Sequence, residues 1–220
     1  MRGIFISGTG TEVGKTVVAA ALMHRYRNTA TLCYWKPIQT GIEQSDDSST
    51  VRALGNCADT EVFDEGIRLR GAYSPYFAAR LAGKEINVES LMQLRPASRT
   101  ELCWIVEGAG GVLVPVTDWH MMADLIAKMD LPVLVVAAST LGTINHTLMT
   151  LETLRRRSLR VAGVIMVGDP NKANREAIER FGQVDILGEL PTFSPLTPEI
   201  LATWARAELD PKGLLAEFFR

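Results

Sequence analysis

A glycine-rich stretch near the start of the chain, GTGTEVGKT from Gly8 to Thr16, has the composition of a phosphate-binding loop. It lies between a short apolar run and a helix-like segment, which is the context that such a loop requires. Glycines let backbone N–H groups turn towards an anion, and a helix N-terminus favours the same charge. We expect Lys15 to contact the β- and γ-phosphates of a nucleotide and Thr16 to offer its hydroxyl to Mg²⁺. The spacing from Gly8 to Gly14 is one residue longer than in the common motif.

Two further charged residues follow apolar runs and belong to the same hypothesis. Lys36 lies in WKPIQTG (residues 35–41) and Glu107 lies in VEGAGG (residues 106–111). Because the carboxyl ends of parallel strands face the ligand crevice, Lys36 should point into the region that Lys15 serves. Glu107 should lie at the rim of the crevice as a Mg²⁺ partner, and the glycines after it allow a nucleotide to approach the backbone. The alternatives are a solvated lysine at a strand end and a carboxylate that only caps a loop.

Lys15, Lys36 and Glu107 can meet only in a fold that brings the ends of several strands together. The pattern of apolar residues predicts such a fold. Five short runs rich in Val, Ile and aromatic residues are nearly continuous, which is typical of strands covered on both faces of a parallel sheet. These runs are residues 3–7, 31–35, 103–108, 132–138 and 161–168. Segments with helical spacing lie at residues 15–26, 144–157 and 171–182.

The alternation of strand-like and helical segments predicts a doubly wound α/β fold of the P-loop NTPase type, with a mainly parallel sheet and helices on both faces. We expect a single domain over residues 1–220, with a loop at residues 190–199 before a final helical region. Gly182 is expected to be the C′ glycine that ends the helix before it.

The composition excludes several classes of partner. The formal net charge is −2 and 47% of the residues are hydrophobic, which argues against nucleic acid or an anionic membrane as a bulk partner. Cys33, Cys57 and Cys103 are far apart and lack C-x-x-C spacing, so we expect reduced thiols in a cytoplasmic protein. No apolar run reaches the roughly 18 residues that a membrane span needs.

Four motifs occur in order along the chain, GTGTEVGKT, KPIQTG, VEGAGG and LGTINH. With these motifs the sequence resembles the dethiobiotin synthetases from Gly8 to about Leu190, and the likeness weakens beyond that point. The longer spacing in the glycine-rich loop is that family's own form. The resemblance implies an ATP- and Mg²⁺-dependent ligase of biotin synthesis that acts as a homodimer.

The implied substrates are 7,8-diaminopelargonic acid, CO₂ and a nucleoside triphosphate, ATP. One amine traps CO₂ as a carbamate, whose oxygen attacks the γ-phosphate to give a carbamic-phosphoric anhydride and ADP. The second amine then closes the ureido ring and expels phosphate. Because the carbamate and the triphosphate are both anions, cations are needed where they meet, and Lys15 and Lys36 suit that role.

The resemblance also implies roles for single residues. Lys36 and Lys15 are the implied catalytic groups. The implied substrate contacts are Thr11, Thr40, Gly142 and Asn145, the last two acting on the substrate carboxylate from the neighbouring subunit. The implied nucleotide contacts are Glu12, Val13, Gly14, Lys15, Thr16, Val17, Asp47, Glu107, Gly108, Ala109, Gly110, Gly168, Asp169, Pro191, Thr192 and Phe193.

The metal ligands implied by the resemblance include one aspartate of SDDSS (residues 45–49). We prefer Asp47 to Asp46, because Val51 and Leu54 then fall at i+4 and i+7 of the helix that follows. A solvated acidic loop is the alternative. The implied Mg²⁺ ligands are Thr16, Asp47 and Glu107.

The chain departs from the family at one position of the nucleotide site. After the fifth strand the family commonly has Asn-Asp, whereas this chain has Gly168 and Asp169. An asparagine amide can pair with the adenine edge through one donor and one acceptor, and glycine has no side chain to do so. Base contacts must then come from backbone groups, with Pro191 to Phe193 as candidates, and discrimination among nucleotides should be poor.

Two rival functions come from other classes. A nucleotide switch, such as the partitioning and septum-positioning ATPases of the same superfamily, usually carries a second lysine early in the loop, where this chain has Gly10 and Thr11. A cobalamin-pathway amidation domain would need an added glutaminase domain.

Tyr76 has two possible roles, contact with the substrate's alkyl chain or burial in the core.

Overall fold

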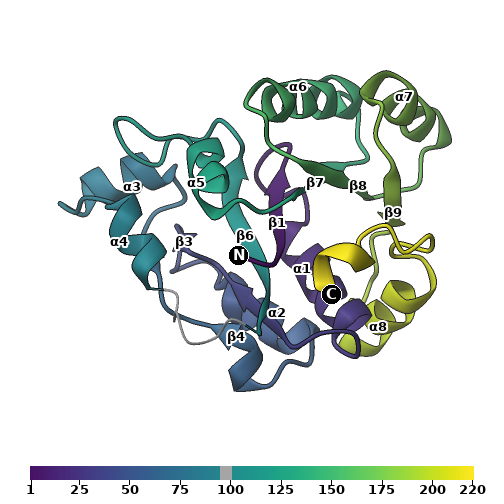
Figure 1. Ribbon diagram of the computed structural model, residues 1–220, viewed down its shortest axis with the longest axis horizontal. Helices are drawn as coiled ribbons and strands as arrows, with labels where there is room; N and C mark the ends of the chain where they lie inside the picture. The colour runs from purple at the N-terminus through teal and green to yellow at the C-terminus, as the bar shows by residue number, and fades with distance from the viewer. Residues whose placement is uncertain (95–100) are drawn as a thin grey trace.

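The computed structural model describes residues 1–94 and 101–220. Its strands are β1 (Gly3–Gly8), β2 (Leu32–Trp35), β3 (Ile38–Gln39), β4 (Val62–Phe63), β5 (Ile67–Arg68), β6 (Cys103–Gly111), β7 (Val133–Ala138), β8 (Val161–Val167) and β9 (Ile186–Leu190). Seven of them form one sheet in the order β4-β2-β6-β1-β7-β8-β9, in which every neighbouring pair is parallel (Figure 1). A separate small sheet joins β3 and β5.

Helices cover both faces of this sheet. They are α1 (Lys15–Tyr26), α2 (Asp47–Leu54), α3 (Pro75–Leu81), α4 (Val88–Gln93), α5 (Met122–Met129), α6 (Thr143–Arg156), α7 (Lys172–Gly182) and α8 (Pro198–Ala207). One hydrophobic core joins the sheet to α1, α2 and α8, and a second joins it to α4, α5, α6 and α7. Figure 1 shows α6 and α7 side by side over β7 and β8.

The central strand β1 explains the nearly continuous apolar pattern. Ile4 and Ile6 belong to the core on the α1 side, whereas Phe5 between them belongs to the other core. Successive side chains point to opposite faces of a strand, so a strand buried on both faces is apolar at nearly every position, and Ser7 is the only polar side chain of β1. The predicted doubly wound parallel sheet is confirmed.

The five predicted strands correspond to β1, β2, β6, β7 and β8, and two edge strands were missed. β4 is only two residues long. In β9, the glycine and glutamate of ILGEL interrupt the apolar run. A Cβ atom at Gly188 would lie 3.3 Å from the carbonyl oxygen of Glu208 and 3.4 Å from the Trp204 ring of α8, so the helix packs closely on this strand.

Two local predictions were wrong. Gly182 is the last residue of α7 rather than its C′ residue, and Gln183 takes the left-handed conformation with φ 45°. Gly182 instead lies against α6, where a Cβ atom would be 2.9 Å from Leu151 Cδ1. Glu107 does not follow its strand, because β6 continues to Gly111, and its side chain is buried rather than at a rim.

The chain after α8 returns to pack on α1, beside which Figure 1 shows the C-terminus. The hydroxyl of Tyr26 donates a hydrogen bond to the buried carboxylate of Asp210, and the rings of Tyr26 and Phe219 stack with their centroids 4.3 Å apart. The same carboxylate accepts the N–H groups of Leu214 and Leu215, each at 2.8 Å. The C-terminal segment therefore completes the core around α1.

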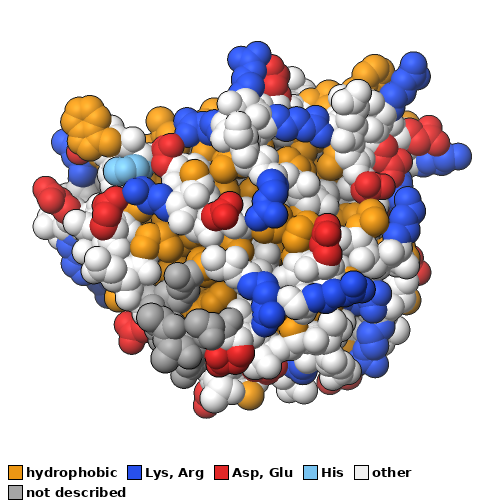
Figure 2. All heavy atoms as spheres, in the orientation of Figure 1, with side chains coloured by type: hydrophobic (Ala, Val, Ile, Leu, Met, Phe, Trp, Pro, Cys, Tyr) orange, Lys and Arg blue, Asp and Glu red, His pale blue; other side chains and the backbone are white. Residues whose placement is uncertain are grey.

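The surface carries charges of both signs. On the face shown in Figure 2, acidic and basic side chains lie among one another, in keeping with a formal net charge of −2. Among the residues that the structure describes, no helix has the length and apolar character of a membrane span.

Candidate active site

The loop between β1 and α1 closes around the side chain of Lys15. Lys15 Nζ donates to the carbonyl of Gly10 at 2.9 Å, and only 7% of the residue is exposed. Gly14 has a left-handed φ of 93°, and a Cβ atom there would lie 2.9 Å from Val167 Cγ1. Glycine is therefore needed at position 14 so that the loop can turn and pack against the end of β8.

The Lys15 ammonium lies in an environment that disfavours its charge. Burial, and then the positive charge of Lys36, lower the pKa of Lys15 to about 8. An anionic group bound at the loop would oppose both effects and keep the ammonium charged. The position of Lys15 therefore favours the binding of an anion such as a phosphate.

Lys36 lies directly after β2 and is enclosed by two carboxylates. Its Nζ is 2.7 Å from Oε1 of Glu107 on β6 and 2.5 Å from Oδ2 of Asp47 at the start of α2. Only 4% of Lys36 is exposed, which excludes the solvated lysine. Burial acts to lower the pKa of Lys36, but the charges of Glu107 and Asp47 outweigh it and raise that pKa above its usual value. Lys36 is therefore a buried lysine whose charged form is favoured by its two partners.

Thr16 in the first turn of α1 completes this cluster. Its hydroxyl donates to Oε1 of Glu107 at 3.1 Å, so its lone pairs remain available to a cation. Together with Asp47 it offers the hard oxygen ligands that Mg²⁺ takes, usually one or two carboxylates beside substrate phosphates. Within residues 1–94 and 101–220, no group of three or more His, Cys, Asp and Glu side chains could hold a metal by itself. The donor set fits a Mg²⁺ ion shared with a nucleotide.

The two aspartates before α2 have different surroundings. Asp46 is the N-cap of the helix, and its Oδ1 accepts the N–H of Ser48 at 3.0 Å. Asp47 is left to contact the lysine, and its own N–H donates to Oε1 of Gln39 at 3.2 Å. The geometry therefore favours Asp47 over Asp46 as a residue of the site.

Two residues of the cluster were not predicted from the sequence. Gln39 lies inside the KPIQTG motif, and its side-chain amide donates a hydrogen bond to the carbonyl of Ser45, just before α2. Tyr34 precedes Lys36 by two residues, and its hydroxyl donates to Oε2 of Glu107 at 2.8 Å. The period of two along a strand places Tyr34 on the same face as Lys36, which is the only signal that the sequence carries for it.

One cavity of about 350 Å³ gathers most of the predicted residues at the carboxyl ends of β1, β2 and β6. Gln39 also lines it. Of the other predicted loop residues, Val13 is buried in the core and Gly108 accepts a hydrogen bond from Lys36 Nζ at 3.3 Å. The predicted residues that line the cavity are Thr11, Glu12, Gly14, Lys15, Thr16, Val17, Lys36, Thr40, Asp47, Glu107, Ala109 and Gly110.

The residues predicted for the nucleobase lie outside this cavity, at the ends of β8 and β9. The N–H of Gly168 donates to the carbonyl of Leu190 at 2.9 Å, which brings Gly168 next to Pro191. The carbonyl of Asp169 accepts the Ser139 hydroxyl at 2.6 Å. Thr192 is exposed and Phe193 packs on the α1 core, so the structure does not gather all these residues into one pocket.

The N-terminus of α6 is also outside the cavity, and it is exposed. Gly142 is its left-handed N-cap with φ 94°, and Asn145 lies in the first turn. A neighbouring cavity of about 350 Å³ lies between α6 and the loop after β6. Thr11 lines both cavities, so the two adjoin at this residue.

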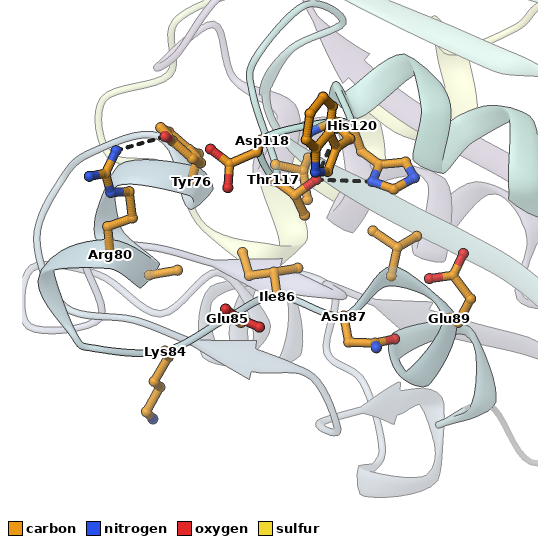
Figure 3. A pocket seen from close by; sticks show the side chains of 14 residues that line it. Tyr76, Arg80, Lys84, Glu85, Ile86, Asn87, Glu89, Thr117, Asp118 and His120 are labelled. Atoms are coloured by element: carbon orange, nitrogen blue, oxygen red, sulfur yellow. Dashed lines mark hydrogen bonds between the residues drawn. The ribbon is translucent and has the colours of Figure 1, made fainter.

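A larger cavity of about 590 Å³ lies elsewhere, between α3, the segment 84–89 and the loop 116–120 (Figure 3). It contains none of the phosphate-loop residues. Tyr76 lines it and accepts a hydrogen bond from Arg80 at 2.8 Å, as Figure 3 shows. Tyr76 is half-buried beside this separate cavity, so burial in the core does not describe it, and contact with the substrate's alkyl chain stays a prediction.

Comparisons with known proteins identify the family of this chain. A family model described as an AAA domain matches residues 2–200. An ATP-dependent dethiobiotin synthetase of Paramagnetospirillum magneticum is 44% identical over 202 residues, which cover 92% of this chain and 94% of that protein. One of Agrobacterium fabrum is 43% identical over 196 residues, 89% of each chain. The chain belongs to the dethiobiotin synthetase family.

The fold of this synthetase-family chain is shared with an ATPase of another family. A ParA family ATPase from Chlorobium tepidum superposes with a TM-score of 0.60 over 100% of this chain and 98% of that one, at 11% identity. Likeness at such low identity concerns the fold alone. It therefore gives no support to the switch function considered above.

Proposed function

We propose that this protein is the ligase that converts 7,8-diaminopelargonic acid and CO₂ to dethiobiotin, with ATP converted to ADP and phosphate. The proposal is supported by its family membership and by one observation above all. Two buried lysines from different elements, Lys15 and Lys36, line the same cavity, and Lys36 is held by two carboxylates. Two ammonium groups at one cavity suit a reaction between two anions.

In the proposed reaction, one amine of the diamine adds to CO₂ and loses a proton, which leaves a carbamate. A carbamate oxygen attacks the γ-phosphorus of ATP, the bond to the β-phosphate oxygen breaks, and ADP leaves. The second amine attacks the carbonyl carbon of the resulting anhydride and expels phosphate, which closes the ureido ring. Lys15 would bind the β- and γ-phosphates, and Lys36 would hold the carbamate oxygen against the phosphorus.

The proposed metal ligands are Thr16, Asp47 and Glu107, where a bound Mg²⁺ would neutralise charge on the β- and γ-phosphate oxygens. Because Asp47 and Glu107 already contact Lys36, these carboxylates would be shared between the ion and the lysine. Lys36 would thus lie at the boundary between the phosphate end of the site and the substrate end, which we assign to Thr11 and Thr40.

The remaining nucleotide roles stay proposals. The backbone of residues 12–17 would wrap the phosphates, and Gly108, Ala109 and Gly110 would allow close approach to the nucleotide. Gly168, Asp169 and residues 191–193 would border the base.

We also propose a homodimer. Three apolar side chains near the second cavity and the N-terminus of α6 are exposed in the single chain, and a partner would cover them. Gly142 and Asn145 of one subunit would then receive the substrate carboxylate of the other at the N-terminus of α6. These apolar residues are Leu113, Leu141 and Met149, which are 53%, 104% and 55% exposed.

We further propose that residues 1–220 act as one catalytic unit in the cytoplasm. The family match over residues 2–200 and the packing of the C-terminal segment on α1 support a single unit. The biosynthetic names of the relatives support the location.

The test is phosphate release by the purified protein with ATP, Mg²⁺ and ¹³C-bicarbonate, with and without the diamine. We expect release only when the diamine is present, and one ¹³C atom in the dethiobiotin found by mass spectrometry. Phosphate release at the same rate without the diamine, and no labelled product, would instead favour the nucleotide switch.

A further inference from the structure

Tyr34 is a fully buried tyrosine whose hydroxyl reaches the centre of the proposed site. It lies on β2, next to β6, and its backbone pairs with Ile105, two residues before Glu107. This register brings the Tyr34 hydroxyl to 2.8 Å from Oε2 of Glu107. Neither the motifs nor the proposed mechanism gives Tyr34 a role.

The two oxygens of the Glu107 carboxylate have different partners. Oε1 accepts from Lys36 Nζ at 2.7 Å and from the Thr16 hydroxyl at 3.1 Å. Oε2 accepts from Tyr34. Only 1% of Glu107 is exposed, so water has little access to replace a lost partner. The carboxyl group cannot rotate to exchange its oxygens without breaking the bond from Tyr34.

We propose that Tyr34 is a positioning residue of the ligase, whose hydroxyl holds Oε2 of Glu107 and thereby directs Oε1 to Lys36, Thr16 and the Mg²⁺–nucleotide complex. This inference rests on the proposed function. Hydrogen-bond partners that orient a metal-ligating group contribute strongly to metal affinity, and their loss typically costs about 10- to 100-fold. Tyr34 would contact neither substrate nor metal, and it would act through Glu107.

A purely structural role makes a different prediction. A buried tyrosine hydroxyl normally finds a partner, and Glu107 could simply be the nearest acceptor. In that case removing the hydroxyl would change the stability of the fold but leave the metal affinity of the folded protein unchanged. The positioning role requires the metal affinity to fall in protein that is still folded.

Tyr26 offers a matched control, because it is also a buried tyrosine whose hydroxyl donates to a buried carboxylate, that of Asp210. Tyr26→Phe and Tyr34→Phe each remove one hydroxyl from such a pair, but only Tyr34 is at the site. Mn²⁺ affinity is measured by electron paramagnetic resonance in the presence of ADP, and the KM for Mg²⁺ and kcat are measured separately. Near-ultraviolet circular dichroism verifies that each variant is folded, and Tyr34→Met provides a second donor-free side chain.

We expect Tyr34→Phe to weaken Mn²⁺ binding to the ADP complex about tenfold or more and to raise the KM for Mg²⁺ by a similar factor. Tyr26→Phe should change neither by more than about twofold. Unchanged Mn²⁺ affinity in both Tyr34 variants would overturn the positioning role, as would Mn²⁺ binding that survives Glu107→Gln intact. The proposed function fails separately, if the wild-type protein makes no labelled dethiobiotin while its Mn²⁺ affinity still depends on Tyr34.

Discussion

The two lysines of the site are in different electrostatic states although they line one cavity. Lys15 donates to a backbone carbonyl and has its pKa lowered to about 8, by burial first and by Lys36 second. Lys36 lies between Asp47 and Glu107, which raise its pKa in spite of complete burial. A bound triphosphate would therefore supply the negative charge that Lys15 lacks, whereas the positive charge of Lys36 is already balanced by Asp47 and Glu107. This difference suggests that Lys15 serves binding and Lys36 serves the chemical step.

The first prediction separates those two roles. Lys36→Gln should lower kcat by about 10²–10³, the usual cost of losing one oriented charge at a reacting group, while ATP affinity changes little. Lys15→Ala is the comparison and should lose both ATP affinity and turnover. Calorimetry gives the affinities, and single-turnover experiments give the rates. If Lys36→Gln instead loses ATP binding while its single-turnover rate stays normal, the two roles are reversed.

The second prediction concerns Gly168. Because no side chain at this position can read the base, kcat/KM for ATP, CTP, GTP and UTP should agree within about tenfold. Lys15→Ala should lower all four values together, since the triphosphate grip is common to them. Steady-state kinetics with each nucleotide is the measurement, and a preference of about a hundredfold for ATP would mean that another group reads the base.

Gly168→Asn would introduce the family's asparagine, but it would also place a side chain on an unusual backbone conformation. Gly168 has φ 119°, a region that side-chain-bearing residues rarely adopt. A Cβ atom there would make ordinary van der Waals contact with Ser139, whose Cβ lies 3.5 Å away. The backbone conformation, rather than a clash, is therefore what favours glycine here.

At the scale of single elements, α7 shows how packing overrides a local signal. Gly182 has the residue type of a C′ position, but it is used for close contact with α6. The left-handed turn falls instead on Gln183, a conformation that costs a non-glycine residue about 1–2 kcal/mol. Arg155 of α6 donates to the carbonyl of Gln183 at 2.9 Å and helps to hold this turn.

The third prediction follows from that arrangement. Gln183→Gly should raise the free energy of unfolding by about 1 kcal/mol, because it relieves the left-handed strain and keeps the backbone bond from Arg155. Gly182→Val should lower it by about 1–3 kcal/mol, because the added side chain meets Leu151 and Leu148. Urea denaturation measures both. If Gln183→Gly instead lowered the free energy of unfolding, the left-handed turn at Gln183 would not be a source of strain.

At the scale of the whole molecule, the proposed substrate contacts are divided between two regions. Lys36 and Thr11 line the cavity at the carboxyl ends of β1, β2 and β6, whereas Gly142 and Asn145 lie on the exposed end of α6. A second subunit can bring the end of its own α6 to this cavity, since a two-fold interface uses the same surface on both chains. The exposed Leu113 and Met149 would be buried by such an interface.

The fourth prediction tests this assembly. Light scattering should give the mass of two chains for the wild type, and Leu113→Asp with Met149→Asp should give one chain with low activity. Phe181→Asp, on α7, changes an equally exposed apolar residue and should leave the dimer intact. A fully active single chain would contradict the homodimer.

Mixed variants give a sharper form of the same test. Asn145→Ala and Lys36→Ala are each expected to be inactive alone. Random exchange of subunits should restore about a quarter of the sites, because each mixed dimer has one site that carries neither change. If the mixture stays inactive after exchange, both residues serve the site of a single subunit.

Some features of this protein follow from the sequence alone because they depend on neighbouring residues. The glycine-rich loop before α1, the apolar strands and the helical periods are local patterns, and the order of the four motifs identified the family. The choice of Asp47 over Asp46 also had a local basis, since it relied on the spacing along α2. These signals were sufficient to predict the parallel sheet and to list most of the residues that line the cavity.

Only the tertiary structure decided how those residues are paired. Lys36 and Glu107 are 71 positions apart, and they meet because β2 and β6 are neighbours in the sheet with a defined register. The same register buries Glu107 and brings the Tyr34 hydroxyl to its second oxygen. Burial and ion pairing set the charge states of the lysines, and both depend on contacts between distant segments, which no local pattern contains.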